Sequence, residues 1–79
     1  MNGAELLKSK GITQAQLSRH LGCKPNNVNI WFCGSHEPKV ATINKLVAAV
    51  NELGAETNYQ ELYKALKQSR KEYLAKKRG

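Results

Sequence analysis

Apolar residues recur along this chain at the spacing of helices, and glycines divide it into short segments. The clearest case is a stripe at positions i, i+3, i+6, i+7 and i+10, formed by Val40, Ile43, Leu46, Val47 and Val50. Such spacing gathers apolar side chains on one face of a helix, whereas no segment alternates between apolar and polar residues as a half-exposed strand does. The pattern predicts an all-α fold, a compact domain of four to five helices.

The first two helices are marked by residues that cap helix N-termini. A helix is expected over residues 3–9, with Asn2 as its N-cap. Thr13, followed three residues later by Gln16, has the spacing of a capping box, in which each side chain binds the other residue's backbone N–H. A second helix should therefore begin after Thr13 and end at Gly22, since glycine tolerates the backbone conformation that ends helices.

A third helix is expected over residues 25–33, and a fourth opens at Pro38. Pro25 suits the first turn of a helix, because its missing N–H would have no partner there. Val28 and Trp31 lie three residues apart on one face and are expected to point inward. The opposite face is expected to carry Asn26, Asn29, Ile30 and Cys33, with Asn27 to one side.

The C-terminal segment has an amphipathic pattern of its own, which predicts a helix over residues 58–74. Arg70 interrupts its apolar face. An isolated helix of this length is marginal in water, so the face should pack partly on the chain's own core and partly on a second subunit. The expected buried residues are Tyr59, Leu62, Tyr63, Leu66, Tyr73 and Leu74.

The charge is strongly positive and unevenly spread. Thirteen Lys and Arg residues against six Asp and Glu give a net charge of +7. Seven of the basic residues and only two of the acidic ones lie in residues 58–79. This favours a polyanionic partner, with nucleic acid first. The N-terminus lacks the pattern of a signal peptide, and no segment reaches the ~20 apolar residues that span a bilayer, so we expect a cytoplasmic protein with no membrane partner.

Two His–Cys pairs supply the residue types of a zinc site, His20 with Cys23 and Cys33 with His36. The third helix would hold the pairs more than ~12 Å apart, whereas zinc needs every ligand within ~2.3 Å. Neither a metal nor a Cys23–Cys33 disulfide is therefore expected. The sequence has no Ser-His-Asp set, phosphate loop or paired carboxylates, and it contains no Asp. We accordingly expect neither an enzyme nor a cofactor.

Residues of the expected second and third helices, and of the turn between them, match the motif of a known protein family. The matching residues in the second helix and its turn are Gln14, Leu17, Ser18, Leu21 and Gly22, with Ser18 where alanine is usual. The later matches are Val28, Trp31, Gly34, Pro38, Val40, Ile43, Leu46 and Val50. Over about residues 3–54 the chain thus resembles the helix-turn-helix of phage Cro proteins and phage repressors. The resemblance implies a DNA-binding domain in residues 1–57. Residues 58–79 would form an amphipathic basic helix and tail, in the same domain or serving dimerisation. The alternative is a flexible basic arm along the DNA phosphates, which explains Lys76, Lys77 and Arg78 but gives the apolar face no purpose.

The expected DNA contacts fall into two groups. A recognition helix in the major groove reads bases, where asparagine pairs with adenine and isoleucine touches a thymine methyl. Base contacts are expected from Lys24, Asn26, Asn27, Asn29 and Ile30. The resemblance places Gln14 on a phosphate, and the positive end of the fourth helix favours phosphates nearby. The residues expected there are Ser35, His36, Lys39 and Thr42.

Two functions remain open from the sequence. The first is a Cro-like repressor that binds double-stranded operator DNA, as a homodimer at least on DNA, since one short recognition helix reads few base pairs. The second is an antitoxin of the helix-turn-helix type, whose tail binds a toxin while the motif autoregulates the operon. A neighbouring toxin gene would favour the second function, and a divergently transcribed repressor gene the first.

Overall fold

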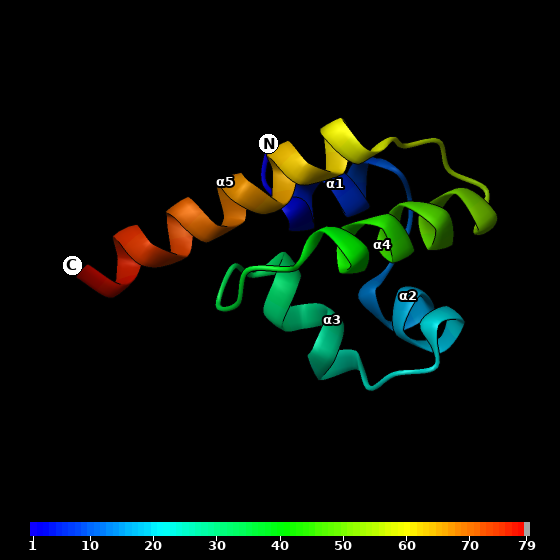
Figure 1. Ribbon diagram of the computed structural model, residues 1–79, viewed down its shortest axis with the longest axis horizontal. Helices are drawn as coiled ribbons and strands as arrows, with labels where there is room; N and C mark the ends of the chain where they lie inside the picture. The colour runs from blue at the N-terminus through cyan, green and yellow to red at the C-terminus, as the bar shows by residue number, and fades with distance from the viewer. Residues whose placement is uncertain (79) are drawn as a thin grey trace.

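Five helices and no strand make up the part of the chain that the structure describes, which is residues 1–78 with side chains to Lys77. The computed structural model confirms the all-α prediction. The helices are α1 (Gly3–Ser9), α2 (Gln14–Leu21), α3 (Pro25–Phe32), α4 (Val40–Glu52) and α5 (Tyr59–Arg78). Figure 1 shows α2 and α3 together below α4, with α1 and α5 side by side above it.

Both predicted N-caps are present. The Asn2 side chain accepts a hydrogen bond from the Glu5 N–H at 2.9 Å, and the Glu5 carboxylate accepts one from the Asn2 N–H at 3.0 Å. Thr13 and Gln16 make the reciprocal pair at 3.1 and 2.8 Å. Each box satisfies two backbone N–H groups that have no partner inside a helix, so α1 and α2 begin where the sequence predicted.

The start of α4 differs from the prediction. The helix begins at Val40 rather than Pro38, and Lys39 is its N-cap. Val40 was expected in the buried stripe but is 63% exposed, whereas Ala49, which the stripe omitted, is buried. Val40 is exposed because it is the first residue of the helix and lies beyond the edge of the core, which only the later turns of α4 cover.

One core joins all five helices. At its centre Leu17, Val28, Leu46 and Leu62, from four different helices, are fully buried. The remaining buried apolar residues are Leu6, Leu7, Ile12, Phe32, Ile43, Ala49, Val50, Ala65 and Leu66. A chain of 79 residues buries a modest core, so each of these side chains represents a large share of its stability.

The face that α5 buries is only partly the predicted one. Leu62 and Leu66 are buried as expected, Tyr59 and Tyr73 are half-buried, and Tyr63 and Leu74 are exposed. The other buried positions belong to small residues, Ala65 and Ser69. At Ser69, α5 passes very close to two glycines. A Cβ on Gly34 would collide with the backbone carbonyl of Ser69, and the Gly3 N–H donates to Ser69 Oγ at 2.7 Å.

Candidate nucleic-acid interface

The turn between α2 and α3 fixes the angle at which α3 leaves the core. Gly22 caps α2 with φ of 71°, in the left-handed region where a side chain is strained. Two residues later Lys24 is the N-cap of α3, and Pro25 occupies the first turn as predicted. Ser18 is 1% exposed, and its hydroxyl donates to the Ala15 carbonyl at 2.9 Å. A small residue at this position therefore allows α2 to pack closely without leaving its polar atom unsatisfied.

The outer face of α3 is formed by asparagines. Asn26, Asn27 and Asn29 are all exposed, while Val28 and Phe32 on the other side are buried. Within residues 1–78, none of these three side-chain amides forms a hydrogen bond to the protein. Ile30 is half-buried rather than fully exposed. The helix thus presents several free donor and acceptor groups on one side.

The inward residues of α3 were predicted only in part. Val28 is buried, but Trp31 is half-buried, and Phe32 takes the second inward position at 1% exposure. Trp31 instead lies beside a shallow hollow between α2 and α4, lined also by Cys23, Thr42 and Lys45. The helix ends at Phe32, with Cys33 as its C-cap, one residue earlier than expected.

The predicted phosphate contacts are divided between two regions. Ser35 and His36 lie together in the loop between α3 and α4, with Ser35 Oγ 3.2 Å from His36 Nδ1. Lys39 follows as the exposed N-cap of α4, and no side chain caps that helix. Thr42 lies in the hollow next to Trp31, and Gln14 lies at the start of α2 near the α1–α2 turn. Ser35, His36, Lys39 and Thr42 therefore follow one another through the loop and the first turn of α4, whereas Gln14 lies at the start of α2.

Sequence reasoning missed the part that Arg70 has in this region. Its Nη1 donates to the backbone carbonyls of Gly34 and Ser35 at 2.9 and 2.8 Å, which ties α5 to the loop between α3 and α4. The signal was present as a basic residue that interrupts an apolar stripe. A guanidinium at such a position is suited to binding free carbonyls at the end of a neighbouring helix.

The His and Cys residues have other neighbours. His20 Nε2 lies 3.3 Å from Glu52 Oε2, and Cys33 Sγ lies 3.6 Å from Ser35 Oγ. Across residues 1–78, no three His, Cys, Asp or Glu side chains come together as metal ligands would. Both cysteines are free thiols.

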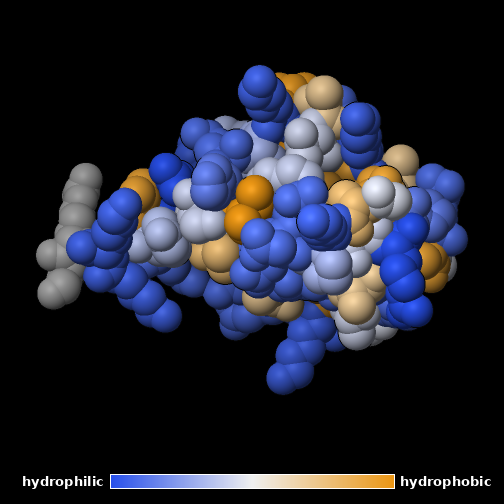
Figure 2. All heavy atoms as spheres, turned by 90° about the horizontal axis from the view of Figure 1, so that it is seen from below, coloured by the Kyte–Doolittle hydropathy of each residue, from blue (hydrophilic) through white to orange (hydrophobic). Residues whose placement is uncertain are grey.

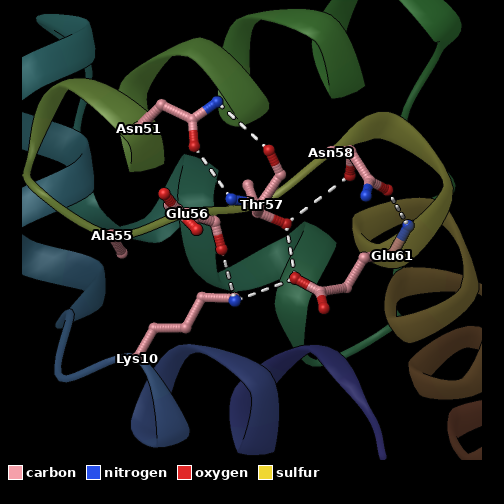
Figure 3. Close-up of a pocket in the computed structure, with 7 residues that line it drawn as sticks. All are labelled: Lys10, Asn51, Ala55, Glu56, Thr57, Asn58 and Glu61. Atoms are coloured by element: carbon pink, nitrogen blue, oxygen red, sulfur yellow. Dashed lines mark hydrogen bonds and ion pairs between the residues drawn. The ribbon is translucent and has the colours of Figure 1, made fainter.

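On the opposite side of the molecule, polar residues around a hollow hold in place the loop that leads into α5 (Figure 3). Lys10 pairs with Glu61 at 2.9 Å, and the Asn51 side chain binds the backbone of Thr57 through both its oxygen and its nitrogen. Asn58 caps α5 by accepting from the Glu61 N–H at 2.8 Å. The hydrogen bonds from Lys10 and then Thr57 lower the pKa of Glu61 below its usual 4.5. These polar groups bind one another, so the hollow serves to position α5.

Comparisons with known proteins add no relative. No protein-family model, no curated protein and no solved structure matches this chain. Through residue 78, no helix is both long and apolar enough to cross a membrane.

Proposed function

We propose that the protein is a sequence-specific, double-stranded DNA-binding repressor of the helix-turn-helix type, similar to phage Cro. In this proposal α2 and α3 form the motif, and α3 enters the major groove. The observation that carries it is the outer face of α3, where three exposed asparagine amides have no hydrogen-bond partner among the described side chains and backbone. Amides are the groups that pair bidentately with adenine, and the groove, about 12 Å wide, admits one helix.

The polarity of the surface around α3 fits a charged, hydrated partner such as DNA. Figure 2 views the molecule from the α2–α3 side and shows a largely hydrophilic face on which apolar atoms form small separate spots. Interfaces with DNA are more polar and more positive than interfaces between proteins. A net charge of +7 fits such a partner. Ser35, His36 and Lys39, which follow α3 directly, are the proposed phosphate contacts beside it.

A homodimer on a two-fold symmetric site completes the proposal. α3 has only eight residues, so one copy reaches few base pairs. Pairing two copies by a two-fold axis doubles the sequence that is read, and the operator then consists of two inverted half-sites.

The test is selection of bound duplexes from a random pool with the purified protein. We expect one enriched sequence made of two inverted half-sites. A template with that sequence inside a promoter should be transcribed less when the protein is added, whereas a template with the sequence far upstream should not. A pool that shows no enrichment after repeated rounds would refute sequence-specific binding, and an enriched site without symmetry would refute the two-fold dimer.

A further inference from the structure

The charges on α5 are separated onto different sides of the helix. Both of its carboxylates face α1. Glu61 binds Lys10 and Thr57, and Glu72 accepts from Gln68 at 3.0 Å and from Asn2 at 2.8 Å. The hydrogen bonds from Gln68 and then Asn2 also lower the pKa of Glu72, so both carboxylates are ionised at neutral pH. The negative charge of α5 is therefore directed away from the loop between α3 and α4.

The side of α5 that faces this loop is basic. At 100° per residue, Lys67, Arg70 and Lys77 lie in one stripe, with Tyr63 and Leu74 between them. Arg70 binds the carbonyls of Gly34 and Ser35, and Lys67 lines a small hollow with Glu37 and Pro38 of the same loop. Among the described residues, Glu37 is the one acid of the loop, and no ion pair joins it to a lysine. This side thus has a net positive charge and is continuous with Ser35 and His36.

The stripe also extends beyond the loop. Figure 1 shows the C-terminal end of α5 continuing past the other helices. Ten residues separate Lys67 from Lys77, which is about 15 Å of helix. The phosphates of one DNA strand advance about 3.4 Å each along the duplex axis, so a helix of this length lying along that axis spans roughly four phosphates.

We propose that the loop-facing side of α5, formed by Lys67, Arg70 and Lys77, is a second phosphate-binding surface that extends the DNA footprint beyond the base pairs read by α3. The inference rests on the proposed DNA-binding function. It differs from a flexible basic tail, because Arg70 and the close contact of Ser69 with Gly34 hold α5 against the loop. A fixed helix contacts the same few phosphates in every complex, next to those bound by the loop.

The experiment compares two double variants that each remove two positive charges. Lys67→Gln/Lys77→Gln changes the loop-facing side, and Lys8→Gln/Lys76→Gln changes the α1 side as the control. All four lysines are exposed, so neither variant should alter the melting temperature. Affinity for the selected duplex is measured at salt concentrations from about 50 to 200 mM, where each lost phosphate contact lowers the log–log slope by about 0.9.

We expect the slope to fall by about two units for the loop-facing variant and to stay near the wild-type slope for the control. Trimming the duplex by about four base pairs beyond the site should weaken wild-type binding to the level of the loop-facing variant and leave that variant's affinity unchanged. Equal slopes for the two variants, or no effect of trimming, would overturn the second surface while leaving the proposed function intact. Failure of the wild-type protein to bind any duplex would instead overturn the proposed function.

Discussion

Trp31 and Phe32 are neighbours on α3, and only Phe32 is fully buried. From Val28, a helix brings both the third and the fourth following residue back to the same face, so the sequence pattern fits either residue. Phe32 is the buried residue of the two because α1 and α5 cover the C-terminal end of α3. A Cβ on Gly3 would come within 2.8 Å of the Phe32 ring, which shows how tightly this end is enclosed.

Phe32→Ala should therefore destabilise the fold far more than Trp31→Ala. Loss of a fully buried phenylalanine costs about 3–5 kcal/mol, which is a large part of the stability available to a domain of this size. Trp31 is half-buried beside an open hollow, so its loss should cost clearly less. Urea denaturation of both variants measures the difference. Equal destabilisation, or a larger effect at Trp31, would contradict the inward position of Phe32.

Asn26→Ala tests the outer face of the same helix. Asn26 is exposed, and its side chain bonds to nothing in the part of the chain that the structure describes, so the fold should be unaffected. On the selected duplex the variant should lose about 1–3 kcal/mol of binding free energy and lose preference at one base pair. Affinity for a random duplex should hardly change, because base contacts add nothing there. Equal losses on the two duplexes would exclude base reading by Asn26.

Local signals predicted the helices well, and long-range packing explains what they missed. A capping box involves residues three positions apart, so the starts of α1 and α2 follow from Asn2 and Thr13 alone. The buried face of α5 depends instead on contacts with Gly3 and Gly34, which are distant in sequence from α5 and lie very close to Ser69. The sequence pattern was built from large apolar side chains, so it placed Tyr63 on the buried face and left out Ala65 and Ser69, which are buried.

The same limit applied to the candidate site. The asparagines of α3 were identifiable because Pro25 and Val28 set the helix and its inner face within a few residues. Arg70 lies 36 residues from Gly34, and only the fold brings them together. No local pattern links a basic residue in a C-terminal helix to carbonyls at the end of α3.

Arg70→Met should loosen the contact between α5 and the loop, because it removes the guanidinium and keeps an unbranched apolar stem. Two hydrogen bonds from a guanidinium to carbonyls are lost, so the free energy of unfolding should fall by about 1.5–3 kcal/mol. Amide exchange should quicken at residues 34–36. Lys71→Met is the matched control, because Lys71 is exposed on the next position of the helix. Unchanged exchange in the Arg70 variant would show that other contacts hold the loop.

The stability contributed by the Lys10–Glu61 ion pair, which joins the end of α1 to the start of α5, should depend on pH. The pKa of Glu61 is lowered in the fold, so its ion pair stabilises the protein above the usual value of 4.5 and this contribution is lost as pH falls through the lowered pKa. Glu61→Gln should cost less than about 1 kcal/mol at pH 7, since the pair is partly exposed. The difference from wild type should shrink in titrations below pH 4.5. A difference that persisted in acid would mean that the charge of Glu61 contributes nothing.

On the scale of the whole molecule, α5 belongs to two environments. Its first half supplies Leu62, Ala65 and Leu66 to the core, whereas residues 74–77 near its end are exposed. The helix of 20 residues is about 30 Å long, and the molecule is 37 Å in its longest dimension and 23 Å across. The projecting end accounts for this elongation, and it is the part that remains available to DNA or to a second copy.

Two truncations separate the roles of these halves. A chain ending after Gly54 uncovers the core that Leu62 and Leu66 close, so it should be unfolded or strongly destabilised in thermal melts. A chain ending after Tyr73 keeps those residues and the Arg70 contacts, so it should melt near the wild-type temperature. It loses Leu74, Lys76 and Lys77, and any dimer that the projecting end forms should disappear when mass is measured in solution. If the chain ending after Gly54 melted like wild type, α5 would be a separable tail. If the chain ending after Tyr73 kept the wild-type mass, the projecting end would have no part in dimerisation.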